Sequence, residues 1–140
     1  MSVYLDAGLL VPTLVERPSS PIAAAFVRRP PADLVVSEFA CAEVASALSR
    51  LVRMGALTWD DVEERLAAFD AWRAALAPCP IESADHAAAY GLVRRFDLAL
   101  RAPDALHLAL CRRRDHELAT LDRRLARAAT TLAVRATFLS

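Results

Sequence analysis

Short runs of strand-forming residues alternate with helical segments along this chain, and that alternation is the strongest constraint on its fold. The runs are apolar and lie at residues 3–5, 34–36, 116–121 and 133–138. Strands joined through helices run parallel, and their helices cover both faces of the sheet. The pattern therefore predicts an α/β protein, a three-layer α/β/α sandwich with a central parallel sheet.

Apolar spacing and capping residues place the helices between these runs. Ser37 is a plausible N-cap and Gly55 a C-terminal stop, while Thr58 with Asp61 resembles a capping box. We expect the two helices that these residues delimit to form a hairpin. The predicted helices cover residues 9–15, 21–28, 37–54, 58–76, 83–96, 103–113 and 123–128.

The composition fits one domain spanning residues 1–140, because 56% of the residues are hydrophobic, enough for one well-filled core. Seventeen basic residues balance seventeen acidic ones, so a surface that binds nucleic acid would have to be local. Every one of those basic residues is Arg. The lack of Lys excludes a phosphate-loop nucleotide hydrolase and Schiff-base chemistry.

The apolar runs are shorter than the roughly 18 residues that would suggest a membrane span. The N-terminal residues lack the basic and apolar regions of a secretory signal. We therefore expect a cytoplasmic protein without membrane contact. Cys41, Cys79 and Cys111 are far apart in the sequence and are predicted to be buried free thiols.

Asp6, Glu43, Asp104 and Asp122 are the candidate functional residues. Asp6 and Asp122 directly follow predicted strands, and Asp104 lies in a first helical turn, where the helix dipole alone would favour it. Glu43 lies in the middle of a helix and has no such explanation. Two carboxylates about 4 Å apart would repel by about 4 kcal/mol, so a fold that gathers acids needs a cation. Oxygen ligands of this kind suit Mg²⁺ or Mn²⁺.

Segments around these acids resemble the PIN domain and, within it, the VapC toxins of toxin–antitoxin modules. The matching segments are Tyr4-Leu5-Asp6, residues 37–48, residues 101–109 and residues 120–125. The resemblance implies that Asp6, Glu43, Asp104 and Asp122 form a Mg²⁺- or Mn²⁺-dependent catalytic site that cleaves RNA. It also implies a cognate VapB-like antitoxin as partner, and a homodimer.

Gly8 departs from the family pattern, which often has a hydroxyl or amide residue two positions after the first Asp. Thr120 does match a small hydroxyl of the family, and we expect it to orient metal-bound water. The alternative to a ribonuclease toxin is therefore a catalytically weakened binding module with the same fold. A phosphoacceptor receiver domain is disfavoured because a second acid beside Asp6 and a Lys are both missing.

Other residues have simpler explanations than catalysis. His107 follows Asp104 on one helical face, but a His among Leu and Ala is more often a hydrogen-bonded core residue than a metal ligand. His86 and His116 have no Ser or Cys at a telling sequence spacing, which disfavours nucleophilic catalysis. Among the arginines, Arg123 and Arg124 have the best claim to phosphate binding. Three further residues are assigned to helix-dipole or packing roles: Glu38, Trp59 and Trp72.

Overall fold

A computed structural model describes residues 2–140 as a parallel sheet between two layers of helices. Four strands of this part of the chain form the sheet in the order β2-β1-β3-β4, and every pairing is parallel. The strands are β1 (Ser2–Leu5), β2 (Asp33–Val35), β3 (Glu117–Thr120) and β4 (Ala136–Phe138). The predicted α/β/α sandwich is confirmed.

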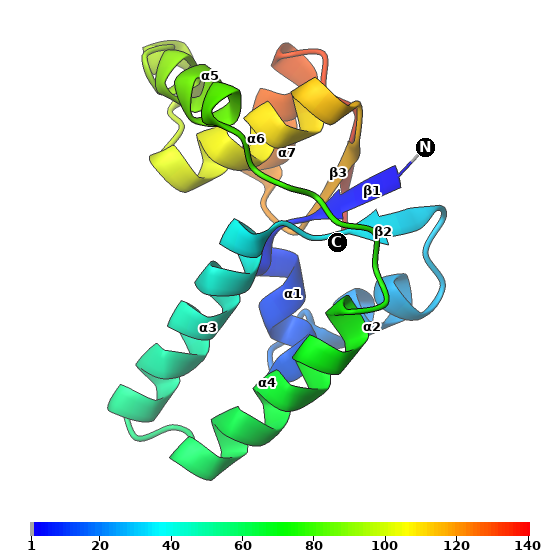
Figure 1. Cartoon of the computed structure of the whole chain (residues 1–140), viewed down its shortest axis with the longest axis vertical. Helices are drawn as coiled ribbons and strands as arrows, with labels where there is room; N and C mark the ends of the chain where they lie inside the picture. The colour runs from blue at the N-terminus through cyan, green and yellow to red at the C-terminus, as the bar shows by residue number, and fades with distance from the viewer. Residues whose placement is uncertain (1) are drawn as a thin grey trace.

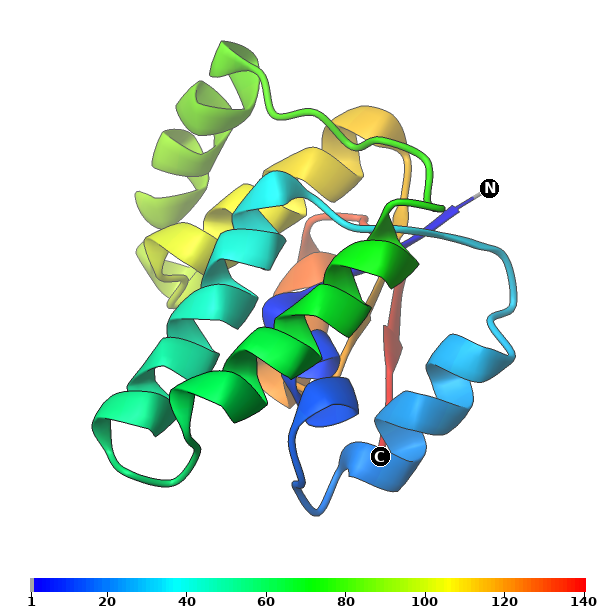
Figure 2. The same ribbon diagram turned by 60° about the horizontal axis from the view of Figure 1, so that its bottom comes forward.

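The helices lie between the strands in the sequence. The bounds are α1 (Ala7–Leu14), α2 (Ser20–Arg28), α3 (Glu38–Arg53), α4 (Trp59–Arg73), α5 (Ser83–Val93), α6 (Ala102–Arg114) and α7 (Arg123–Thr131), with a 3-10 helix η1 (Phe96–Leu98). Figure 1 shows α3 and α4 side by side on one side of the sheet, with α5, α6 and α7 on the other. Figure 2 shows α2 beyond this hairpin, near the C-terminus.

Each face of the sheet has its own apolar core, because successive side chains of a strand point to opposite faces. Val3 and Leu5 pack with α1, α3 and α4, whereas Tyr4 between them packs with α5, α6 and α7. All three of these strand side chains are at most 1% exposed. Strand β1 is therefore buried on both sides, which explains why its sequence is apolar without interruption.

The predicted starts of the third and fourth helices are confirmed, because capping side chains define them, whereas α1 begins at Ala7, two residues before its predicted start, because Asp6 caps it. The hydroxyl of Ser37 accepts the N–H of Ala40, and Thr58 with Asp61 forms a complete capping box. The fifth helix is shorter than predicted and ends at Val93 instead of 96. Phe96 is 86% exposed, so packing does not extend the apolar stripe of the helix to this residue.

No helix within residues 2–140 has the length and apolar character needed to cross a membrane.

Candidate metal centre

The candidate acids are positioned by the edge of the sheet where its parallel strands end. Strand order changes direction at β1, since β2 lies on one side and β3 with β4 on the other. Ligand crevices of open α/β sheets lie at such a switch point, outside the carboxyl ends of the strands. Asp6 follows β1 there, and Asp122 follows the neighbouring β3.

Asp6 is 6% exposed and both of its carboxylate oxygens accept hydrogen bonds. Oδ1 accepts the backbone N–H of Leu9 at 3.0 Å, which makes Asp6 the N-cap of α1. Oδ2 accepts the hydroxyl proton of Thr120 at 2.7 Å. The register that pairs Leu5 with Ala119 brings these two side chains together.

Thr120 links two of the four predicted site residues. Its oxygen also accepts the backbone N–H of Asp122 at 3.0 Å, so one hydroxyl connects Asp6 to Asp122. Asp122 is exposed, and its Oδ1 caps α7 by accepting the N–H groups of Arg124 and Leu125. The sequence suggested that Thr120 orients metal-bound water. Its only hydroxyl proton goes to Asp6 instead, so Thr120 orients a carboxylate and cannot donate to a bound water.

Glu43 lies on α3 and reaches toward α6. Its Oε1 is 2.6 Å from Nε2 of His107, which is 2% exposed. The Glu43 side chain remains 28% exposed, so the carboxylate stands between the core and solvent. The mid-helix acid that lacked a local explanation therefore has a partner that is 64 residues away in the sequence.

Asp104 lies in the first turn of α6, partly buried, and three residues before His107. Residues at this spacing share one face of a helix. Asp104 is therefore one turn along α6 from the histidine that contacts Glu43.

Burial raises the pKa of Asp6 above its ordinary value, and the negative charge of Glu43 raises it further. The hydroxyl of Thr120, a positive charge on His107 when it is protonated and the N–H of Leu9 act in the opposite direction. Glu43 therefore adds negative charge to the surroundings of a carboxylate that is already buried. A cation between them would relieve both the repulsion and the burial of charge.

The donor set fits a hard divalent ion, although the acids do not form a closed cage. Within residues 2–140, no three His, Cys, Asp or Glu side chains converge closely enough to hold an ion by themselves. Mg²⁺ usually keeps several waters and binds through one or two carboxylates, which matches a buried Asp6 beside Glu43. Asp104 is partly buried and Asp122 is exposed.

Gly8 is exposed beside the site. A Cβ atom built at this position would lie 3.7 Å from Oδ1 and 3.9 Å from Oδ2 of Asp6, in ordinary van der Waals contact. Neighbouring residues of the chain and the helix backbone aside, the three nearest atoms all belong to the Asp6 carboxyl group. A side chain at position 8 would therefore reach the Asp6 carboxylate, and Gly8 leaves that place open.

Sequence reasoning missed two polar residues next to the site, Tyr4 and Ser37. The Tyr4 hydroxyl lies 2.6 Å from Nδ1 of His107 and 2.7 Å from the Ser37 oxygen. A signal was present, because a phenol inside a buried strand needs a hydrogen-bond partner. The expectation that His107 is a hydrogen-bonded core residue agrees with its two bonds.

At the other end of the parallel strands, His116 has hydrogen-bond partners that its spacing in the sequence did not indicate. Ser2 Oγ lies 2.8 Å from its Nδ1, and Cys79 Sγ lies 3.9 Å from its Nε2. Burial raises the pKa of the Cys79 thiol, so the sulfur keeps its proton and is a poor nucleophile. These contacts are structural and give no support to nucleophilic catalysis.

A known protein family matches most of this chain. The PIN domain family model matches residues 3–130, and this chain belongs to the PIN domain family. A comparison with curated proteins returned no significant match.

Solved structures of similar fold come from toxin–antitoxin modules. VapC20 of Mycobacterium tuberculosis, described as a toxin that cleaves the sarcin–ricin loop, superposes with a TM-score of 0.73 at 14% identity, covering 90% of this chain and 94% of that one. VapBC2 of Rickettsia felis, crystallised with a promoter DNA fragment, gives 0.72 at 13% identity and covers 100% of both chains. FitAcB of Neisseria gonorrhoeae gives 0.69 at 17%, covering 96% and 95%. At such identities the likeness is one of fold.

Proposed function

We propose that this chain is the toxin of a VapBC-type module, a Mg²⁺- or Mn²⁺-dependent endoribonuclease acting in the cytoplasm. The observation that carries the proposal is the buried acid at the switch point of the sheet. Asp6 is buried with its pKa raised, its two oxygens accept hydrogen bonds from the neutral groups of Leu9 and Thr120, and the negative charge of Glu43 raises that pKa further. Such an arrangement costs the metal-free fold stability and makes sense as a site for a cation.

In this proposal Asp6 and Glu43 hold the ion, with Asp104 and Asp122 acting around it through water. A divalent ion would supply activation of a water molecule and neutralise charge on the phosphate that is cleaved. Thr120 keeps the Asp6 carboxylate in place through its hydroxyl. Asp122 is itself anchored as the cap of α7, which fixes its carboxylate at the mouth of the site.

The decisive test compares two aspartates that both lie in first helical turns. Asp104→Asn should abolish RNA cleavage and growth arrest, and Asp60→Asn, in the exposed first turn of α4, should leave both unchanged. Each change removes one negative charge that interacts favourably with a helix dipole, which costs roughly 0.3–1 kcal/mol of stability. A difference in RNA cleavage between the two variants therefore cannot come from stability alone. Equal cleavage by Asp104→Asn and wild type would refute the site assignment.

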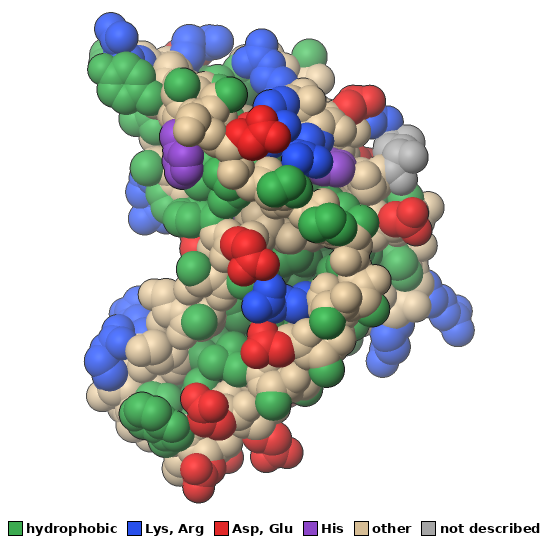
Figure 3. All heavy atoms as spheres, in the orientation of Figure 1, with side chains coloured by type: hydrophobic (Ala, Val, Ile, Leu, Met, Phe, Trp, Pro, Cys, Tyr) green, Lys and Arg blue, Asp and Glu red, His purple; other side chains and the backbone are tan. Residues whose placement is uncertain are grey.

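RNA binding requires a local basic surface, since the net charge is zero. On the face shown in Figure 3, basic side chains gather over the end formed by α5 and α6, and acidic ones over the tip of the α3–α4 hairpin. Some of those arginines are already used, because Arg113 pairs with Asp85 and Glu82. Arg123 and Arg124 are exposed directly after Asp122, and we assign phosphate contacts to them.

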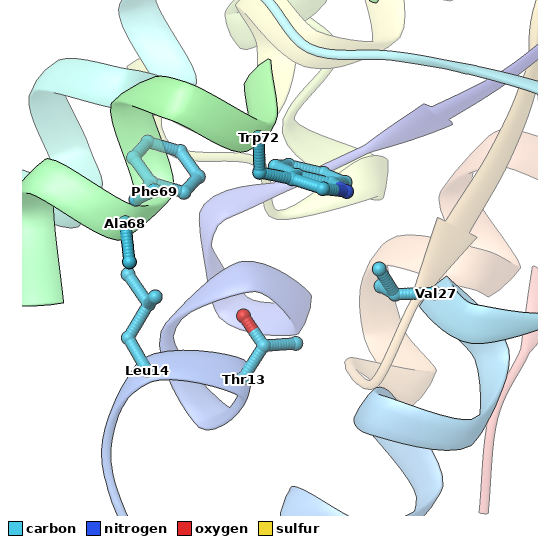
Figure 4. A pocket seen from close by; sticks show the side chains of 6 residues that line it. All are labelled: Thr13, Leu14, Val27, Ala68, Phe69 and Trp72. Atoms are coloured by element: carbon cyan, nitrogen blue, oxygen red, sulfur yellow. The ribbon is translucent and has the colours of Figure 1, made fainter. Parts of the chain in front are cut away.

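The antitoxin partner should dock on the helical layer of α1, α2 and α4. The apolar sides of residues 9–15 and 44–51 are largely used in the core, where Leu9, Leu10, Val44 and Leu48 are fully buried. One groove of about 200 Å³ stays open beside α1, lined by Thr13, Leu14, Val27, Ala68, Phe69 and Trp72 (Figure 4). An amphipathic helix places its apolar side chains in a groove of this kind.

An arginine in the groove tests the docking site. Ala68→Arg should abolish rescue from growth arrest by the co-expressed antitoxin, with RNA cleavage retained. The matched control is Ala87→Arg on α5, which is equally a solvent-exposed alanine. Rescue of the Ala68→Arg toxin as efficient as that of wild type would place the antitoxin elsewhere.

The expected homodimer needs an exposed apolar face, and α5 with η1 offers one. Tyr90 is 68% exposed and lines an apolar hollow of about 440 Å³, and Phe96, three residues after the end of α5, is 86% exposed. Phe96→Ser should turn a dimer into a monomer in light scattering after gel filtration. Trp59→Ser, which changes a side chain that is 72% exposed on the hairpin, should not. Dimeric Phe96→Ser protein would exclude this face.

The second candidate is a PIN-fold binding module with weakened chemistry. Gly8 favours it, because the place beside the Asp6 carboxylate has no side chain. Calorimetric titration with Mn²⁺ distinguishes the two functions. A toxin should bind Mn²⁺ in a way that Asp6→Asn removes, and a module that has lost its site should not bind it.

A further inference from the structure

A ring of hydrogen bonds surrounds the point where Glu43 meets the core. It runs from the Ser37 hydroxyl to the Tyr4 hydroxyl, from there to Nδ1 of His107, and from Nε2 of His107 to Oε1 of Glu43. Ser37 caps α3, the same helix that carries Glu43, so the ring closes on itself. It joins three elements, β1, α3 and α6, in one arrangement.

The direction of each bond follows from the chemistry of the groups. An ionised Glu43 can only accept, so Nε2 of His107 carries a proton. When the imidazole is neutral, its Nδ1 accepts the hydroxyl proton of Tyr4. Burial raises the pKa of the Tyr4 phenol and keeps it protonated. The Tyr4 oxygen accepts in turn from Ser37, whose oxygen accepts the N–H of Ala40. Every donor of the ring is used once.

Packing against two aromatic side chains holds the His107 imidazole in its place within this ring of hydrogen bonds. The His107 ring centroid lies 5.5 Å from that of Tyr4 and 5.7 Å from that of Phe39, both in tilted contact. The plane of the imidazole is thus set by two aromatic neighbours, and its two nitrogens by hydrogen bonds. A group this constrained can determine where the more exposed Glu43 carboxylate lies.

We infer that His107 is a positioning residue, which holds the Glu43 carboxylate through Nε2 in the orientation that receives the metal ion. This inference rests on the proposed function, because it assigns Glu43 as a ligand. The bond occupies Oε1 and leaves Oε2 for the cation. His107 lies behind the acid, in the core, and acts through the acid without touching the ion or RNA.

Two amide variants separate the two sides of the imidazole. Glutamine can place its amide N–H near Nε2, and asparagine reaches only as far as Nδ1. We therefore expect His107→Asn to lower Mn²⁺ affinity in calorimetry by about 10- to 100-fold, the usual effect of losing a partner behind a ligand. His107→Gln should stay within about threefold of wild type. In a Glu43→Gln background, His107→Asn should have no further effect.

Thermal unfolding without metal provides the control for a purely structural role. If His107→Asn does not fold, Tyr4→Phe replaces it, since it removes only the hydroxyl that fixes Nδ1, and it should also weaken Mn²⁺ binding. Wild-type Mn²⁺ affinity in a folded His107→Asn or Tyr4→Phe protein would overturn the inference, as would an equal loss in the Asn and Gln variants. If wild-type protein shows no Mn²⁺ binding that depends on Asp6, the proposed function itself fails and the inference falls with it.

Discussion

Replacing Thr120 with Val tests how the two acids at the switch point are held together. The change keeps a β-branched side chain of similar volume in β3 and removes one hydroxyl that is fully buried. That hydroxyl donates to Asp6 at 2.7 Å and accepts from the backbone of Asp122 at 3.0 Å. Valine can make neither bond.

The expected loss is the sum of two buried hydrogen bonds. A bond to a charged group contributes roughly 1.5–3 kcal/mol and one between neutral groups about 1 kcal/mol, so we expect Thr120→Val to lower the free energy of unfolding by about 2–4 kcal/mol. At this chain length the midpoint of thermal unfolding should fall by roughly 6–15 °C. The loss should shrink at acid pH, because the bond from Thr120 favours the charged form of Asp6 and lowers its pKa.

Urea unfolding at pH 7.5 in the presence of a chelator, followed by tryptophan fluorescence, measures this loss. Calorimetry with Mn²⁺ then tests the function, and affinity should fall by about 10- to 100-fold. Thr137→Val is the matched control, since Thr137 donates to Glu117 at 2.7 Å on β4, away from the acids. It should cost less than about 1 kcal/mol and leave Mn²⁺ affinity unchanged. A cost below about 0.5 kcal/mol for Thr120→Val would refute this account of the site.

Three further predictions follow from the same contacts. Metal-free Asp6→Asn should gain stability relative to wild type as the pH rises from below 4 to 7.5, because the raised pKa of Asp6 gives wild type stability below the ordinary value of 3.8 that is lost as pH rises through the folded value; thermal unfolding of both proteins at both pH values checks this. Gly8→Ser should be stabilising by under about 0.5 kcal/mol from helix propensity and should raise the rate of RNA cleavage, because its hydroxyl can reach Asp6; an unchanged rate would show that Gly8 does not limit activity. Arg113→Met should destabilise the fold by about 2–4 kcal/mol in urea, because it leaves the carboxylate of Asp85, 1% exposed, without its cation, and Mn²⁺ affinity should be unaffected.

The elements of the fold could largely be predicted from the sequence, because their signals are local. A strand is recognised from a few neighbouring residues, and the caps Ser37 and Thr58 act on N–H groups within one turn. The four acids could be named for the same reason, through their places after strands and within helices and through family resemblance. The boundary at residue 93 was missed because it depends on whether Phe96 packs, which is not a local property.

The contacts around those acids were decided only by the tertiary structure. Thr120 meets Asp6 across 114 residues, and His107 meets Tyr4 across 103, because parallel pairing of β1 with β3 and packing of α6 bring them together. Spacing in the sequence carries no information about such distances. The sequence alone therefore determined which residues were available for a metal site, whereas the pairing of β1 with β3 determined that Asp6 meets Thr120, and the packing of α6 against α3 determined that Glu43 meets His107.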